Sequence, residues 1–286
     1  MKKIGALPSQ EIKEMIDAGF IKNSNLSALQ PASLDLRISD ELYRVSSTFT
    51  PRTDERIIDA AKRLADPEPR EIDDPLEVGV TYLARLQESL ELPKSVYGYA
   101  NPKSTSGRND IHVRLLADGM QRFDSAGVKG YKGGLWTLIT PRSFRVKLHE
   151  GNSLQQMRFF NHDTRFTTEQ EIEVAYQKYR LLFDAKGKFI PYSDIRIKDY
   201  DGSLILTVNL DRDLVAYRCE GNDNVLDFSR NDHKVEDFFE PIHRPKSGKL
   251  NLRKGDFGFI ISNSCSISRC NTSCENIMFK ITWLNI

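Results

Sequence analysis

The segment that decides the fold is "LWTLITPRSFRVKLHEGNSLQQMRFF", residues 135–160. It contains three runs typical of strands, "LWTLIT", "SFRVKL" and "LQQMRFF", separated by turns that contain Pro or Gly. β-Branched and aromatic residues favour strands, whereas Pro and Gly favour the turns between strands. Similar runs begin near Leu76, so the sequence predicts a mainly antiparallel β domain over residues 76–160.

A few short helices are expected beside these strands. Ser9 stands where it would cap the first helix, whose apolar residues recur at spacings of three and four: Ile12, Met15, Ile16 and Phe20. A second helical pattern lies between Pro51 and Arg70. Thr168 and Glu171 form a capping box for a third helix, whose apolar face runs out at Gly187. We interpret this third helix as a connection between two units.

The composition is that of a globular protein, because 39% of the 286 residues are hydrophobic. No stretch approaches the roughly 20 apolar residues of a membrane span, and the first residues lack the apolar core of a signal peptide. We therefore expect a cytoplasmic protein with no membrane partner.

Cys219 stands alone, and the other cysteines, Cys265, Cys270 and Cys274, crowd together without an obvious fourth zinc ligand. This pattern predicts reduced thiols and no zinc.

The charge is concentrated in one part of the chain. The whole chain carries a net charge of +1, whereas residues 101–147 contain nine Lys or Arg against three Asp. A nucleic-acid binder is usually basic overall, so one basic segment in a balanced chain favours a compact anionic ligand such as a nucleoside triphosphate. From charge alone, a solvated basic surface fits equally well.

Two pairs of segments indicate an internal repeat. "DLRISDELYRV" (35–45) resembles "NLDRDLVAYRC" (209–219) at an offset of 174 residues, and "LEVGVTYLARLQES" (76–89) resembles "LRKGDFGFIISNS" (252–264) at an offset near 176. The shared offset favours a duplication. We predict a first copy over residues 1–164, a connecting helix over 165–187 and an incomplete second copy over 188–286 with an atypical C-terminal tail.

The run "ANPKSTSGRND" (100–110) combines three hydroxyl residues with two cations. Hydroxyl and backbone N–H groups that follow a proline-fixed turn can donate to phosphate oxygens, and Arg can bind such oxygens bidentately. The run lacks the Gly-Lys-Ser ending of a phosphate-binding P-loop. Taken alone, it fits both an anion site and a surface turn.

The neighbours of this run show an ordered resemblance to a known family. Five motifs carry it: "LQPASLDLRI" (29–38), "LELPKSVYGYANPKSTSGR" (90–108), "QRFDSAG" (121–127), "YKGGLWTLITPRSF" (131–144) and "EGNSLQQMRFF" (150–160). In this order they resemble the superfamily of deoxycytidine triphosphate deaminases and deoxyuridine triphosphatases, and particularly its long, internally duplicated bacterial members. The resemblance implies an all-β fold of the dUTPase-like β-clip or distorted-barrel type with a few short helices. It also implies a homo-oligomer, because the sites of the family form between neighbouring subunits or domains.

The resemblance also implies site residues. Four residues match the triphosphate loop and are the predicted phosphate contacts: Lys103, which stands where the family has Arg, Ser104, Thr105 and Arg108. Asp124 matches the Asp of the family beside the nucleoside, and three weaker nucleoside candidates are Gln121, Arg122 and Trp136. The implied ligand is a small deoxynucleotide, not a nucleic acid. In this family Mg²⁺ accompanies the triphosphate and zinc takes no part.

The catalytic group of the family is missing at its expected position. Setting Gly133 on the Gly of the family motif and counting along the strand puts Leu138 where a catalytic Glu belongs, and residues 125–149 contain no Asp or Glu. Deamination needs a base to deprotonate the attacking water, and leucine cannot do this. The catalytic residue is therefore unknown from the sequence.

The leading prediction is hydrolytic deamination of dCTP to dUTP and ammonia. One alternative is a catalytically impaired nucleotide-binding or assembly module, because the base is lost while the triphosphate loop remains. A second alternative is a dUTPase-like triphosphate hydrolase, for which Asp124 is the nearby carboxylate.

Overall fold

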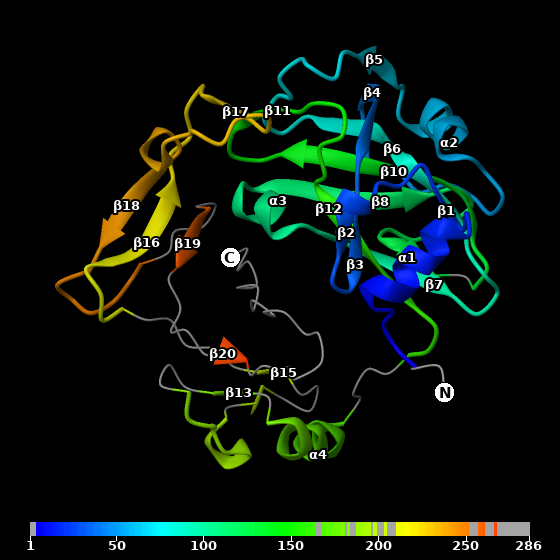
Figure 1. Ribbon diagram of the computed structural model, residues 1–286. Helices are drawn as coiled ribbons and strands as arrows, with labels where there is room; N and C mark the ends of the chain where they lie inside the picture. The colour runs from blue at the N-terminus through cyan, green and yellow to red at the C-terminus, as the bar shows by residue number, and fades with distance from the viewer. Residues whose placement is uncertain are drawn as a thin grey trace. The chain divides into compact units, whose positions relative to one another are not determined.

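The structure is a computed structural model that describes residues 4–127, 129–163, 168–180, 182–183, 187–195, 197–198, 203–204, 210–251, 257–260 and 266–267 (Figure 1). The chain divides into two compact units. The first comprises Met1–Asp163 with Cys219–Phe239, and the second comprises Thr164–Arg218 with Glu240–Ile286. The predicted division into residues 1–164, 165–187 and 188–286 stays a prediction.

The first unit contains a six-stranded antiparallel sheet in the order β5-β4-β6-β10-β8, with β1 paired to β6. Its strands are β1 (Ile21–Lys22), β4 (Ile38–Val45), β5 (Glu68–Arg70), β6 (Thr81–Glu91), β8 (Ile111–Ala117) and β10 (Lys132–Pro141). Strand β10 lies inside this sheet, because it pairs with both β6 and β8.

A second antiparallel sheet has the order β2-β3-β12-β7-β9. Its strands are β2 (Leu29–Gln30), β3 (Ser33–Leu36), β7 (Tyr97–Pro102), β9 (Ser125–Ala126) and β12 (Gln155–Phe160). The two sheets share one large core, to which β3, β6, β8 and β12 all contribute buried aliphatic or aromatic side chains. This arrangement confirms the prediction of a mainly β, barrel-like fold, and the strands expected within residues 76–160 are present.

Within its described residues, the N-terminal part of the first unit has three short α-helices, α1 (Ser9–Asp17), α2 (Ile57–Leu64) and α3 (Ser104–Arg108), and a 3₁₀ turn, η1 (Leu26–Ala28). The prediction that Ser9 caps α1 was wrong by one residue. Pro8 has the extended backbone of the N-cap, and Ser9 is the first residue inside the helix. The Ser9 N–H donates to the Pro31 carbonyl over 2.8 Å, so a tertiary contact satisfies it.

The two faces of β10 belong to different clusters. Leu135 and Ile139 point into the large core, whereas Trp136 and Leu138 belong to a second buried cluster. Helix α2 contributes to that second cluster through buried side chains on one face: Ile57, Ala60 and Ala61. The helix predicted between Pro51 and Arg70 is therefore present, and it covers the outer face of the six-stranded sheet (Figure 1).

A segment distant in sequence completes the first unit. Strand β17 (Val225–Asp227) pairs in parallel with β11 (Arg145–Lys147), and η4 (Val235–Asp237) follows it. Phe144 is 1% exposed and makes T-shaped contacts with Phe238 and Phe239, with ring centroids 5.1 and 5.3 Å apart. Residues 219–239 thus pack with the N-terminal part of the chain.

The second unit contains α4 (Glu169–Tyr179), which begins with the predicted capping box of Thr168 and Glu171. The helix ends earlier than Gly187, because Arg180 adopts a left-handed conformation with φ of 50°. The other elements among its described residues are β13 (Leu182–Phe183), η2 (Tyr192–Asp194), β14 (Ile197–Lys198), β15 (Ser203–Leu204), β16 (Leu214–Cys219), β18 (Phe239–His243), β19 (Gly258–Ile260) and β20 (Ser266–Ile267). The last residue of β16, Cys219, and the first residue of β18, Phe239, are counted with the first unit. Among the described residues, no helix has the length and hydropathy of a membrane span.

Candidate functional site

The predicted phosphate-binding run forms the end of β7 and the short helix α3. The Lys103 N–H donates to the Leu154 carbonyl over 2.9 Å, and the buried Ser106 hydroxyl donates to the same carbonyl over 2.5 Å. Ser106 therefore faces inward, while Thr105 and Arg108 are exposed. The local fold thus presents a hydroxyl group and a guanidinium group to solvent from one turn.

The two cations of this turn have different surroundings. Lys103 forms an ion pair with Asp35 of β3, whose side chain is only 11% exposed. Arg108, by contrast, has no hydrogen-bond or ion-pair partner among the residues that the structure describes. The charge of Lys103 is thus balanced within the protein, and Arg108 is the cation of this turn that is open to an anion. The sequence motif gave no signal for the pairing with Asp35, because 68 residues separate the two.

Asp124 lies close to the strand that leads into this turn. Its backbone carbonyl accepts from the Ala100 N–H over 3.0 Å, and Ala100 belongs to β7. One carboxylate oxygen accepts from the Leu115 N–H over 2.8 Å, and the other lies 3.1 Å from Nη1 of Arg114. Burial raises the pKa of the Asp124 carboxyl above its ordinary value, while the Leu115 N–H and the charge of Arg114 oppose this rise.

The weaker nucleoside candidates lie in two places. Gln121 and Arg122 are exposed in the loop before β9, and the Arg122 guanidinium lies over the Tyr99 ring, 5.8 Å from its centroid. Trp136 is 5% exposed and belongs to the cluster under α2, where Tyr43 and Arg85 contact its ring. The structure therefore brings Arg122 to β7, whereas it packs Trp136 on the outer face of the six-stranded sheet.

Leu138 lies in an apolar environment. It is 2% exposed, and its register partners are Leu83 on β6 and Arg114 on β8. Its cluster contains mainly aliphatic and aromatic residues from β4, α2, β6, β8 and β10. An unpaired carboxylate at this position would lose its hydration, so the surroundings suit leucine better than the Glu of the family motif.

Asp118 fixes α2 above this cluster, a role that sequence reasoning missed. One carboxylate oxygen accepts from the Ile57 N–H at the start of α2 over 2.8 Å, and the other accepts from the Gly134 N–H of β10 over 2.9 Å. A Cβ atom on Gly134 would lie only 2.9 Å from this second oxygen, so glycine permits the contact. An Asp-Gly pair such as that in "LLADG" is typical of a turn, but it carries no signal for a partner 61 residues away.

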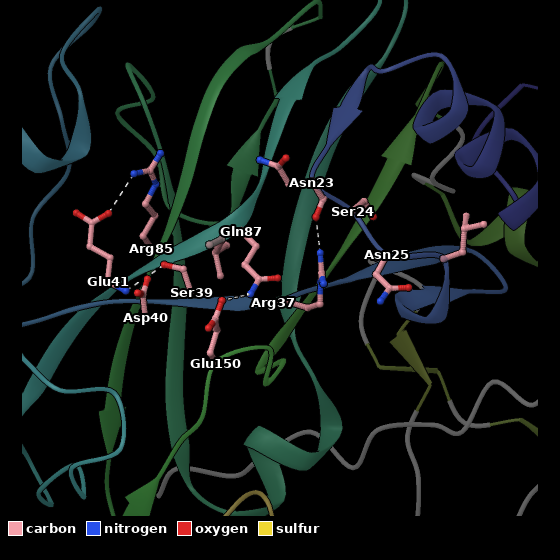
Figure 2. A pocket seen from close by; sticks show the side chains of 12 residues that line it. Asn23, Ser24, Asn25, Arg37, Ser39, Asp40, Glu41, Arg85, Gln87 and Glu150 are labelled. Carbon is pink, nitrogen blue, oxygen red and sulfur yellow. Dashed lines mark hydrogen bonds and ion pairs between the residues drawn. The ribbon is translucent and has the colours of Figure 1, made fainter.

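A polar depression of about 810 Å³ lies elsewhere on the first unit (Figure 2). Arg85 pairs with Glu41 there, and Gln87 donates to Glu150, as Figure 2 shows. Arg37 also borders it and forms an ion pair of 2.8 Å with Glu88, whose side chain is fully buried. None of the predicted phosphate or nucleoside residues lines this depression. The depression does not locate the candidate site. We place that site at α3 and Asp124, because the hydroxyl groups, the guanidinium and the carboxylate there suit a nucleotide.

Metal ligands are not gathered in the described part of the chain. There, no group of three or more His, Cys, Asp or Glu side chains could hold a metal ion. The cysteine cluster of Cys265, Cys270 and Cys274 lies outside the described residues. The sequence prediction of no zinc therefore stays a prediction.

Comparison with family models covers most of the chain. Residues 3–163 match the model described as the N-terminal domain of 2′-deoxycytidine 5′-triphosphate deaminase. Residues 169–281 match the model described as the C-terminal domain of the same enzyme. No curated protein sequence matches the chain.

Comparison with solved structures agrees with the family models. The chain is similar to the crystal structure of 2′-deoxycytidine 5′-triphosphate deaminase from Agrobacterium tumefaciens, with a TM-score of 0.80 and 29% sequence identity. This similarity covers 93% of the present chain and 78% of the other. A native EIAV dUTPase is 20% identical over 32% of this chain and 71% of its own, with a TM-score of 0.24 that supports no conclusion.

Proposed function

Because the chain belongs to the 2′-deoxycytidine 5′-triphosphate deaminase family, we propose that it catalyses the hydrolytic deamination of dCTP to dUTP and ammonia. The observation that carries this proposal is the match of the first family domain over residues 3–163, which include both α3 and Asp124. In the reaction, water adds at C4 of the cytosine and ammonia leaves.

The triphosphate is proposed to bind at α3. Ser104 and Thr105 supply hydroxyl donors, and the open guanidinium of Arg108 supplies a bidentate cation. Lys103 contributes less direct charge, because Asp35 already balances it. Mg²⁺ is proposed to bind the phosphate oxygens of the substrate, because it prefers oxygen ligands.

Asp124 is proposed to orient the nucleoside. Its carboxylate is fixed by the Leu115 N–H and by Arg114, and an oxygen so held can accept from the 3′-hydroxyl of deoxyribose. Arg122 and Gln121, in the same loop, are proposed as further contacts at the edge of the nucleoside.

The group that activates water is proposed to come from outside β10. Leu138 cannot accept a proton, and residues 125–149 contain no carboxylate that a shift in register could bring to its place. A homo-oligomer would supply such a group from a neighbouring subunit, and we propose this assembly together with a cytoplasmic location, where deoxynucleoside triphosphates are available. Loss of a general base typically lowers a rate about 10²- to 10⁴-fold.

A second candidate function is a nucleotide-holding module that performs no chemistry. The burial of Leu138 in an apolar cluster under α2 favours it, because a water molecule and a base would both be excluded there. A third candidate is a triphosphate hydrolase that uses Asp124 to activate water. The observation that favours the hydrolase is the partly buried carboxylate of Asp124, whose pKa burial raises and which pairs with Arg114.

One experiment separates the three candidates. The full chain is incubated with dCTP and Mg²⁺ while ammonia, deoxyuridine products and pyrophosphate are measured, and nucleotide binding is measured by calorimetry. Ammonia with dUTP supports the deaminase, and pyrophosphate release supports the hydrolase. The assay is repeated with dUTP as the substrate. Tight binding of both nucleotides without any product would exclude the deaminase and the hydrolase and leave the nucleotide-holding module.

A further inference from the structure

Helix α3 is too short to be stable by itself, so its contacts must fix its direction. It has five residues, and isolated helices need roughly 12 to 15 residues to be even marginally stable in water. Its first turn is held by Leu154, whose carbonyl accepts from both the Lys103 N–H and the Ser106 hydroxyl. The direction of the exposed Arg108 side chain at the other end depends on what holds the last turn.

Asp110 holds that last turn. The Asp110 backbone is left-handed, with φ of 49°, which reverses the chain two residues after Arg108. Its carboxylate accepts from the Ser143 hydroxyl over 2.7 Å, and its backbone carbonyl accepts from the Arg142 N–H over 2.9 Å. Asp110 is therefore attached twice to the turn between β10 and β11.

Ser143 in turn lies on a well-packed part of the first unit. The next residue, Phe144, is buried against the rings of Phe238 and Phe239. Strand β11 begins one residue later and pairs in parallel with β17. The Ser143 hydroxyl is thus presented to Asp110 from a well-packed segment, to which residues 219–239 contribute.

We propose that Asp110 and Ser143 form a latch that positions Arg108 for the distal phosphates of a bound nucleoside triphosphate. The latch acts through Arg108 and has no contact with the nucleotide itself, so both members are positioning residues. The inference rests on the proposed function for its ligand. Without the latch, Arg108 samples more directions and loses affinity for the distal phosphates, while the nucleoside and the first phosphate keep their contacts.

The test compares Ser143→Ala with Ser143→Thr in the full chain. Affinities for deoxycytidine triphosphate and deoxycytidine monophosphate are measured by calorimetry with Mg²⁺ present. Ser143→Ala is expected to raise the Kd of the triphosphate about fivefold, the value of one typical net hydrogen bond, and to leave the Kd of the monophosphate unchanged. Ser143→Thr keeps the hydroxyl and is expected to restore the affinity for the triphosphate.

The control is Ser47→Ala, which removes a similar hydroxyl donor, here to the Leu64 carbonyl at the end of α2. It is expected to leave both affinities unchanged. Asp110→Gly removes the acceptor without straining the positive φ, and it should lower the affinity for the triphosphate as Ser143→Ala does. The melting temperature of each variant shows whether it is folded.

Three results overturn the proposal. If Ser143→Ala and Asp110→Gly leave the ratio of the two affinities as it is in the unaltered chain, the latch does not position Arg108, although the proposed function stands. If the unaltered chain binds neither nucleotide, the proposed function fails and the latch loses its ligand. A drop in both affinities together would show a general structural role and would also contradict the latch.

Discussion

The turn at α3 and the middle of β10 are both matched by the family pattern, yet their surroundings are opposite. At α3, Thr105 and Arg108 are exposed, and the turn is tied to the rest of the unit through hydrogen bonds. At Leu138 the side chain is sealed in an apolar cluster under α2. Under the proposed assignment, the domain presents an open cation to a charged ligand at α3, whereas the position set on the reacting carboxylate lies in hydrophobic core.

The largest expected effect comes from restoring the carboxylate with Leu138→Glu. An unpaired charge in this cluster should lower the free energy of unfolding by about 3 kcal/mol or more. Leu138→Met, which nearly conserves the volume, should cost less than about 1.5 kcal/mol. Urea denaturation of both variants measures the difference.

The outcome of Leu138→Glu can break the comparison. A stable variant would show that the new carboxylate finds a partner, for which the adjacent Arg114 on β8 is the candidate. In that case position 138 can accommodate a charged side chain. The release of ammonia from dCTP by Leu138→Glu should then be compared with that by the unaltered chain.

The next largest effect is expected at the turn. Arg108→Ala should weaken the binding of dCTP by about 2 kcal/mol, because charge-assisted hydrogen bonds to phosphate are lost. This corresponds to roughly a 30-fold increase in Kd. The control is Arg70→Ala, which removes an exposed Arg from β5 and should leave the Kd unchanged. Isothermal titration measures both, and an unchanged affinity for Arg108→Ala would remove α3 from the site.

The smallest effect concerns pH and Asp124. Because its pKa in the folded chain lies above that of an unfolded Asp, the folded state binds more protons between those two values. Stability contributed by this group therefore falls as the pH rises through that window, which begins near pH 4. Asp124→Asn keeps a side chain that tolerates the positive φ of 58° and should remove this dependence.

The measurement is the free energy of unfolding of the two proteins at several pH values from 4 to 7. The curve for Asp124→Asn should gain on that of the unaltered chain as the pH rises. Parallel curves would mean that Arg114 and the Leu115 N–H fully compensate the burial of the carboxylate.

Local patterns in the sequence predicted the elements well, and their ends less well. The capping box at Thr168 acts between residues three apart, and the structure contains it. The start of α1 and the end of α4 were misjudged because tertiary contact at Pro31 and the left-handed Arg180 decided them. The local sequence pattern does not predict either the contact at Pro31 or the left-handed backbone of Arg180.

At the candidate site, too, the sequence did not predict contacts between residues far apart in the chain. The motifs singled out the run that forms α3 and set Leu138 at the position of the catalytic Glu, because both depend on spacing along the chain, and the roles of these residues stay predictions. The pairing of Lys103 with Asp35, the cap that Asp118 provides for α2 and the link between Asp110 and Ser143 join residues 33 to 68 positions apart. Only the folded chain reveals that these pairs meet, and they decide which charges remain open to a ligand.

The most direct test of the account is the release of ammonia from dCTP and Mg²⁺ by the full chain, with the Agrobacterium tumefaciens deaminase as the positive control for the assay. If the chain is a dCTP deaminase, ammonia and dUTP form in equal amounts, and Arg108→Ala releases less of both at dCTP concentrations near the Kd of the unaltered chain, because its own Kd is roughly 30-fold higher. Calorimetric binding of dCTP with no ammonia above the uncatalysed rate would contradict the proposed deamination.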